Sequence, residues 1–257
     1  MEALKNKVGF ICDMDGVIYH GNRVLPGVQE FVNWMINEGK RFVFLTNSSE
    51  RTPHELSMKL ARMGLDVSAD HFYTSAMATA EFLHSQKPGC TAYVIGEAAL
   101  TKALYDLGIY MNDVNPDYVV MGETRTYSFE KLEKAIELVR NGAKLIGTNP
   151  DITGPSEKGI IPATGALIAP VEIATGKKAY FVGKPNPLIV RHGLAKLGYH
   201  GSQIAFVGDR MDTDILAGIE SNIDTVLVLS GVTSREDIDQ YPYRPKYVLD
   251  GGGDIVK

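Results

Sequence analysis

The feature that most constrains the fold is an alternation of short apolar runs with helix-like stretches along the whole chain. Runs such as 8–12, 41–45 and 204–207 are only four or five residues long, and polar turn residues follow them. Runs of this kind are typical of strands buried on both faces of a parallel sheet. The stretches between them, such as 26–40, carry apolar residues at helical spacing. The alternation therefore predicts an α/β protein with a parallel sheet.

The pattern of alternating strands and helices changes twice along the chain. Residues 76–180 form a second α/β pattern with its own expected elements: strands at 92–95, 118–121 and 144–147, and a helix at 129–140. The first style then resumes in the apolar runs at 179–182, 204–207 and 225–229. One doubly wound core interrupted by a second domain is the simplest interpretation. We therefore expect a core in two parts, 1–76 and 182–257, with an inserted α/β domain at 77–181.

Composition restricts the class of protein and its partners. The chain has 257 residues, of which 44% are hydrophobic and 22% charged, as in an ordinary globular protein. Its net charge of -5 argues against nucleic acid as a partner. We expect no signal peptide and no membrane partner, because no apolar stretch approaches the length that crosses a bilayer. Two cysteines, Cys12 and Cys90, are too few for a disulfide framework or a zinc site, so we expect a reducing cytoplasm.

Two carboxylates follow the first apolar run directly, in Asp13-Met14-Asp15-Gly16-Val17. Ligands of open α/β sheets bind at the carboxyl ends of the strands, so we expect both carboxylates at that edge. Because they are one residue apart, Asp13 and Asp15 should have different surroundings and different roles. Close-set anionic groups need a counter-charge, most simply a hard cation such as Mg²⁺. Taken alone, the segment is equally well explained as a strand followed by an Asp-Gly turn.

A hydroxyl and an amide follow the run at 41–45. Thr46 and Asn47 offer these side chains, together with backbone N–H groups, to phosphate oxygens. The neighbouring Ser48 and Ser49 have a simpler explanation as the N-cap of the next helix.

Two later segments complete the set of polar strand ends. Lys184 follows the run at 179–182, where an ammonium can neutralise both a phosphate and Asp13, unless it is a solvated loop lysine. Asp209 and Asp214 follow the run at 204–207 and supply the further carboxylates that a Mg²⁺ site requires, although aspartates at a helix start often only cap it. The joint occurrence of all four elements favours one phosphate site.

Together these residues resemble the four motifs of the haloacid dehalogenase superfamily, in their usual order. The matching segments are Asp13-Met14-Asp15-Gly16-Val17, Thr46-Asn47, Lys184 and Gly208-Asp209 with Thr213-Asp214. The Gly-Lys-Pro-Asn-Pro loop at 183–187, the large insertion, and Thr148-Asn149-Pro150-Asp151 within it are similar to the NagD-like phosphatase branch. The resemblance covers essentially the whole chain.

The resemblance implies a Mg²⁺-dependent phosphatase that works through an aspartyl-phosphate intermediate. Asp13 would be the nucleophile, and Asp15 would be the general acid and then the general base. Asp13, the backbone carbonyl of Asp15 and Asp209 would hold Mg²⁺. Asp214 would contact these ligands and not the metal ion itself, or would reach the ion through a water. The implied substrate-binding residues are Thr46, Asn47 and Lys184.

The resemblance also implies that the inserted domain, 77–181, is a cap that excludes water and contacts the leaving group. Candidates for its contact surface are 149–155 and Thr164-Gly165-Ala166, although an ordinary surface connection explains the first loop nearly as well. The implied substrates are small phosphate monoesters: nucleoside monophosphates, sugar phosphates or aryl phosphates. A homodimer is left open.

Three other functions are less well supported by these residues. A phosphotransferase or mutase acting on a phosphorylated sugar would use the same nucleophile, but Asp15, placed to activate water, favours hydrolysis. A non-catalytic module that binds a phosphorylated ligand would be expected to have lost the nucleophile, the acid or the lysine, and all three are present. A nicotinamide-dependent oxidoreductase is not supported, because no G-x-G-x-x-G segment opens a helix after an expected strand.

Overall fold

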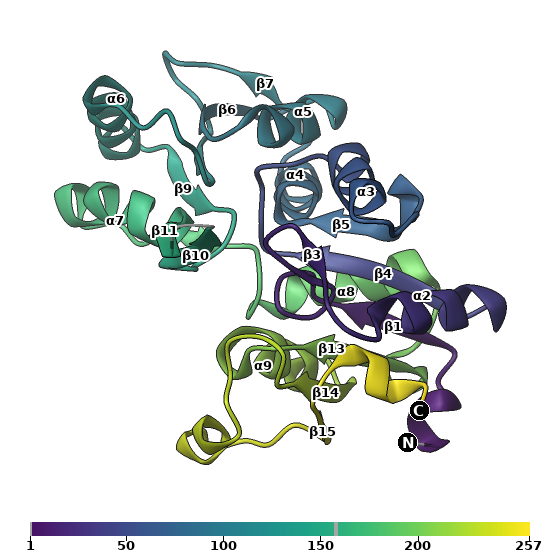
Figure 1. Cartoon of the computed structure of the whole chain (residues 1–257). Helices are drawn as coiled ribbons and strands as arrows, with labels where there is room; N and C mark the ends of the chain where they lie inside the picture. Colours follow the sequence, from purple (N-terminus) through teal and green to yellow (C-terminus); the bar gives the residue numbers. More distant parts are fainter. Residues whose placement is uncertain (1, 157–158) are drawn as a thin grey trace. The chain divides into compact units, whose positions relative to one another are not determined.

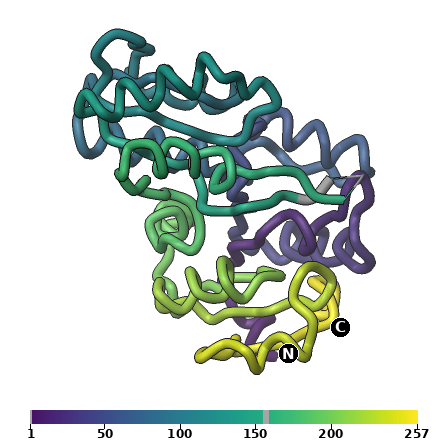
Figure 2. The backbone as a smooth tube through the Cα atoms, turned by 90° about the vertical axis from the view of Figure 1, so that its left-hand side faces the viewer, coloured from purple at the N-terminus to yellow at the C-terminus, as the bar shows by residue number. Residues whose placement is uncertain are grey.

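The structure, a computed structural model, describes residues 2–156 and 159–257 (Figures 1 and 2). The chain forms two compact units. Unit 1 comprises Met1–Thr46, Pro53–Tyr73 and Lys184–Lys257, and unit 2 comprises Asn47–Thr52 and Thr74–Gly183. The range expected for the inserted domain, 77–181, lies within unit 2, to which the short segment 47–52 also belongs.

Unit 1 is built on a six-stranded sheet (Figure 1). In spatial order its strands are β15 (Tyr247–Leu249), β14 (Asp224–Val228), β13 (Ile204–Gly208), β1 (Gly9–Cys12), β4 (Arg41–Thr46) and β5 (Phe72–Thr74). β1 pairs in parallel with both β13 and β4. The chain places β4 and β5 on one side of β1 and the later strands on the other, so the strand order reverses beside β1. Ligands of doubly wound sheets bind at such a reversal, outside the carboxyl ends of the strands.

Helices cover both faces of this sheet. α2 (Val28–Asn37) buries its apolar residues against one face, and α8 (Pro187–Leu197) and α9 (Leu216–Glu220) lie on the other. Gly193 of α8 allows close approach, since a Cβ there would lie 3.2 Å from Leu45 and 3.5 Å from Ile11. The remaining elements of unit 1 are α1 (Glu2–Lys5), β2 (Tyr19–His20), β3 (Arg23–Val24), α3 (Pro53–Arg62), η1 (Ala69–His71), η2 (Gly201–Gln203), η3 (Met211–Ile215), η4 (Glu236–Gln240) and η5 (Gly252–Ile255).

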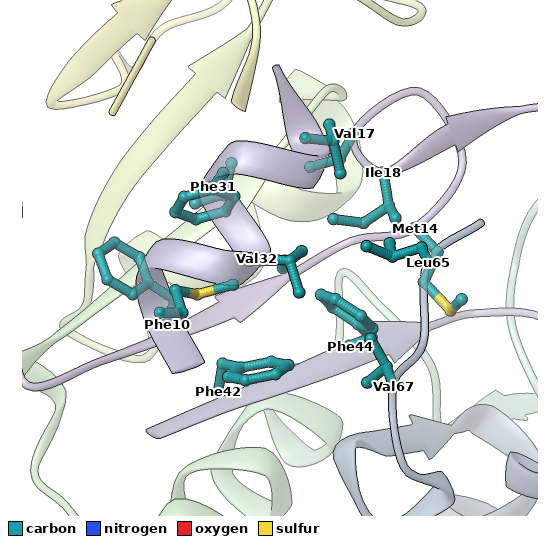
Figure 3. Close-up of a cluster of buried hydrophobic side chains, with 14 of the residues drawn as sticks. Phe10, Met14, Val17, Ile18, Phe31, Val32, Phe42, Phe44, Leu65 and Val67 are labelled. Atoms are coloured by element: carbon teal, nitrogen blue, oxygen red, sulfur yellow. The ribbon is translucent and has the colours of Figure 1, made fainter. Parts of the chain in front are cut away.

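An aromatic cluster packs beneath β1 and fixes the strand that carries the first carboxylates. Figure 3 shows Phe10, Phe31 and Phe44 gathered in this core. The ring centroids of Phe10 and Phe31 are 5.5 Å apart in an edge-to-face arrangement, and Trp34 lies 5.8 Å from Phe10. Such pairs add about 0.5–1.5 kcal/mol to the burial of their surface.

Unit 2 contains a five-stranded parallel sheet. In spatial order its strands are β12 (Tyr180–Phe181), β9 (Lys144–Gly147), β8 (Tyr118–Met121), β6 (Thr91–Ile95) and β7 (Tyr110–Met111). The other elements are α4 (Ser75–Gln86), α5 (Ala98–Asp106), α6 (Phe129–Arg140), α7 (Thr164–Thr175) and a hairpin of β10 (Thr153–Ser156) and β11 (Gly159–Pro162). The expected parallel-sheet α/β fold is therefore confirmed. None of the helices in the described part of the chain is both long and apolar enough to cross a bilayer.

One expected strand was assigned to the wrong sheet. The run at 179–182 was interpreted as a return to the core, but β12 pairs with β9 in unit 2, with Tyr180 beside Ile146. The ring of Phe181 fills the space that a Cβ on Gly147 would occupy. β12 is an edge strand of that sheet and Tyr180 is 45% exposed, so the short apolar run showed neither burial nor the sheet that the strand joins. Lys184 therefore begins the return to unit 1 after a strand of the other sheet.

We predict that Phe44→Ala lowers the free energy of unfolding of unit 1 by about 3–5 kcal/mol, because the cluster around this fully buried ring cannot close the cavity. The chain has one tryptophan, and Trp34 packs in this cluster, so its fluorescence during urea unfolding follows unit 1. Ile36→Ala, at a side chain that is 51% exposed on α2, should change stability little. Equal losses in the two variants would contradict the assignment of this core.

Candidate active site

A buried lysine lies between two carboxylates in unit 1. The Lys184 ammonium donates hydrogen bonds to Asp13 Oδ1 at 2.5 Å and to Asp214 Oδ1 at 2.7 Å. Lys184 is only 3% exposed. Asp13 follows the end of β1, and its N–H donates to the Val207 carbonyl of β13 at 2.8 Å. The nucleophile candidate Asp13 and Lys184 therefore lie together, as the sequence predicts, although Lys184 does not follow a strand of this sheet.

Burial and charge have opposing effects on these groups. Burial raises the pKa of the Asp13 carboxyl well above its usual value, and the charge of Lys184 only partly offsets this. Burial alone would lower the pKa of Lys184, but the charges of Asp13 and Asp214 outweigh that effect and raise it. Lys184 therefore remains an ammonium and serves as the counter-charge of the site.

Asp209 and Asp214 have different environments although both follow β13. The Asp214 Oδ2 atom accepts the N–H groups of Asp209 and Arg210, each at 3.1 Å, while its other oxygen accepts from Lys184. Asp209 Oδ2 accepts the N–H of Val232 at 2.8 Å. Burial, followed by the charge of Asp214, raises the pKa of Asp209 to about 7. Asp214 is thus fixed by the protein itself, whereas the raised pKa of Asp209 shows that nearby positive groups only partly compensate its ionised form.

Three carboxylates in this cluster have the arrangement that a metal ion needs. One oxygen each from Asp13, Asp209 and Asp214 lies within 4.8 Å of the others, and all three residues are buried. Ionisation of all three carboxyl groups requires more positive charge than one ammonium supplies, and hard divalent cations prefer oxygen ligands. The donor set therefore fits a divalent metal ion.

Two glycines shape the surroundings of Asp209: Gly16 of the first motif, and Gly231, which the sequence analysis did not identify. A Cβ on Gly16, which has φ of +78°, or on Gly231 would overlap the Asp209 carboxylate. Gly231 lies in the loop after β14, where the Ser230 hydroxyl donates to the Gly16 carbonyl at 2.7 Å. For Gly231 the available signal was the Ser-Gly pair that follows the buried strand β14. This is the position at which polar groups follow the other core strands.

The side chain of Asp15 is not one of the three buried carboxylates. Its side chain is partly exposed, and its Oδ2 atom accepts a hydrogen bond from the Tyr19 hydroxyl at 3.1 Å. The Lys59 ammonium lies 3.7 Å from the centre of the Tyr19 ring. The two opening carboxylates thus have different surroundings, as their spacing predicts.

The chain passes from unit 1 to unit 2 between Thr46 and Asn47. Thr46 is the buried last residue of β4. Asn47 is buried in unit 2, where its Nδ2 atom donates to Asp151 Oδ2 at 2.9 Å. The N-cap explanation for Ser48 and Ser49 is wrong, because the next helix, α3, begins only at Pro53. The Ser49 hydroxyl donates instead to the carboxylate of Glu123, a residue that the sequence analysis did not identify.

Comparison with known proteins identifies the family. A model described as haloacid dehalogenase-like hydrolase matches residues 10–110, and one described as HAD-hydrolase-like matches 181–254. The ribonucleotide monophosphatase NagD of Escherichia coli is 46% identical over 245 residues, which are 95% of this chain and 96% of that protein. The chain belongs to the haloacid dehalogenase-like hydrolases. Within that family it is a NagD-like phosphatase.

Other relatives of this NagD-like chain carry different substrate names. The dihydroxyacetone phosphatase of Corynebacterium glutamicum is 45% identical over 97% of this chain and 90% of its own length. The acid sugar phosphatase of Staphylococcus saprophyticus is 39% identical over 99% of this chain and 98% of its own length.

Solved structures of the family agree with the fold. The 4-nitrophenylphosphatase of Thermotoga maritima has a TM-score of 0.94 and 37% identity, covering 98% of this chain and 97% of that one. A glycerol phosphate phosphatase of Mycobacterium tuberculosis, solved in complex with magnesium, has a TM-score of 0.93 and 27% identity over 98% of this chain and 77% of that one.

We predict that Lys184→Met destabilises unit 1 of this hydrolase by about 3–5 kcal/mol in the presence of EDTA, because Asp13 and Asp214 lose their shared buried counter-charge. Urea unfolding followed by the fluorescence of Trp34 measures the loss. Lys246→Met removes an exposed ion pair with Asp224 and should leave stability nearly unchanged. If the two variants were equally stable, Lys184 would not be the charge on which the cluster depends.

Proposed function

We propose that this chain is a Mg²⁺-dependent phosphatase that hydrolyses small phosphate monoesters through an aspartyl-phosphate on Asp13. The observation that carries the proposal is the bond from Lys184 to Asp13, 2.5 Å long, beside the carboxylates of Asp209 and Asp214. In this arrangement the Lys184 ammonium favours the ionised form of Asp13, the form that attacks phosphorus, and offsets part of the repulsion of an anionic ester.

The first half of the reaction forms a bond from a carboxylate oxygen of Asp13 to phosphorus and breaks the bond from phosphorus to the ester oxygen. Asp15 gives its proton to that leaving oxygen. In the second half, Asp15 takes a proton from a water, the water oxygen attacks phosphorus, and the bond to Asp13 breaks. Inorganic phosphate leaves, and both carboxyl groups return to their starting states.

The remaining groups bind charge. The Lys184 ammonium, the Thr46 hydroxyl and Asn47 are the proposed ligands of the phosphoryl oxygens, where charge spreads in the transition state. Asp13, the Asp15 carbonyl and Asp209 would hold Mg²⁺, while Asp214 orients Lys184 and the Asp209 backbone through its hydrogen bonds. When bound, Mg²⁺ offsets the repulsion between the nucleophile and the anionic ester.

The proposed substrates are small esters such as triose phosphates, sugar phosphates, nucleoside monophosphates and aryl phosphates. Support comes from the names of relatives that align over nearly the whole chain. We also propose a cytoplasmic location, which fits the two buried free thiols of Cys12 and Cys90.

We predict that Asp13→Asn abolishes phosphate release while the fold survives, because an amide does not displace an alkoxide from phosphorus. Release of phosphate from an aryl phosphate is measured for both proteins with Mg²⁺ and with EDTA. The wild-type protein should be active only with the metal. Near-normal turnover by the variant would exclude Asp13 as nucleophile, and full activity in EDTA would exclude the metal requirement.

We predict that Asp15→Asn lowers kcat by about 10²–10⁴-fold for alkyl phosphates, the usual contribution of general acid–base catalysis. Formation of the phosphoenzyme from aryl phosphates should suffer less, because aryl leaving groups barely need protonation. Single-turnover measurements with matched alkyl and aryl esters give this step directly. An equal loss for both classes of ester would rule out Asp15 as the general acid.

A further inference from the structure

A carboxylate of unit 2 that has no part in the proposed chemistry lies within a polar network. Glu123 follows β8 and is partly buried. Its Oε2 atom accepts the backbone N–H of Ser49 at 3.1 Å and also the Ser49 hydroxyl. Its Oε1 atom accepts from Asn149 Nδ2 at 2.7 Å. One side chain thus connects the segment 47–52 to the loop that follows β9.

The same network fixes the carbonyl group of Asn47. Asn149 Nδ2 donates to this carbonyl at 2.8 Å in addition to its bond with Glu123. The Ser75 hydroxyl, at the start of α4, donates to it as well. The Asn47 carbonyl is therefore held by two donors, one of which Glu123 keeps in place.

The residue that precedes Lys184 packs into this network too. Gly183 donates its N–H to the Thr148 carbonyl at 2.8 Å. A Cβ on Gly183 would lie 2.7 Å from Asn47 Oδ1 and 2.9 Å from the Cβ of Asn149. Asn47 and Gly183 stand at two points where the chain passes between the units, and both pack against Asn149.

The carboxyl group of Glu123 is suited to holding Ser49 and Asn149, because both of its oxygens accept hydrogen bonds. Burial raises the pKa of its carboxyl, while the hydrogen bonds from Ser49 and Asn149 oppose the rise. An ionised carboxylate accepts several donors at once, and such bonds are about twice as strong as neutral ones. A glutamine would offer one acceptor oxygen and would turn an N–H toward Ser49 or Asn149.

We infer that Glu123 is a positioning residue of the phosphatase: by holding Ser49 and Asn149, it sets the place of Asn47, a proposed ligand of the phosphoryl group. The inference rests on the proposed function, because it concerns the phosphate-binding role of Asn47. It assigns Glu123 no contact with the substrate or the metal ion.

The test compares Glu123→Gln and Glu123→Ala with Glu172→Gln. Glu172 is a matched control, since it is a carboxylate of unit 2 that accepts a backbone N–H, that of Ala179 at 2.8 Å, away from this network. The hydrogen-exchange rates of the backbone amides at 47–52 measure how firmly the network holds this segment, and they do not depend on enzymatic activity. The Glu123 variants should speed exchange at Ser49 roughly tenfold or more.

Kinetics then separate positioning from metal binding. The Glu123 variants should lose roughly 10–100-fold in kcat/KM and should bind inorganic phosphate more weakly as an inhibitor. Mg²⁺ affinity, measured by calorimetry, should not change, and Glu172→Gln should behave as the wild type in every measurement. The isosteric Glu123→Gln keeps the test valid should Glu123→Ala fold poorly.

Two results would overturn the inference. One is unchanged exchange at 47–52 in the Glu123 variants, which would mean that Glu123 does not hold the segment. The other is faster exchange with unchanged kcat/KM and phosphate inhibition, which would mean that holding the segment does not position the binding groups. Absence of phosphatase activity in the wild type would instead count against the proposed function, and the exchange data would still report on the network.

Discussion

The site depends on one buried ammonium. Asp13, Asp209 and Asp214 have carboxylate oxygens within 4.8 Å of one another at the edge of an apolar sheet, where anionic groups are strongly disfavoured. Lys184 bonds two of them and keeps its own proton because of them. Lys184 stabilises the carboxylate cluster when no substrate is bound. In the proposed reaction it also binds the phosphoryl group.

The backbone places these charges where side chains alone could not. Asp214 is held by two N–H groups that follow β13, and Asp209 by the N–H of Val232 in the loop after β14. The Asp209 carboxylate fits only because Gly16 and Gly231 have no Cβ. These main-chain donors follow the ends of buried strands, so they orient carboxylates without the loss of entropy that long side chains suffer.

The sequence was sufficient for the residues whose place follows from a strand end. Asp13 and Asp209 meet because β1 and β13 are parallel neighbours, and polar residues after buried runs of a parallel sheet share one edge. The sheet to which β12 belongs could not be predicted, since pairing partners leave no trace in a short apolar run. Glu123 was equally invisible, because its partners Ser49 and Asn149 are 74 and 26 residues away and no spacing rule connects them.

The division of the chain into two units explains why the contact of Glu123 with Ser49 and Asn149 matters. Thr46 belongs to unit 1 and Asn47 to unit 2, and likewise Gly183 and Lys184 stand on different sides of a boundary. A residue beside such a boundary takes its position from whichever unit bonds it more firmly. For Asn47 the carbonyl bonds from Ser75 and Asn149 decide in favour of unit 2. The inferred effect of Glu123, which stabilises Asn149 there, on phosphate binding is therefore one of backbone placement, without contact with the ester.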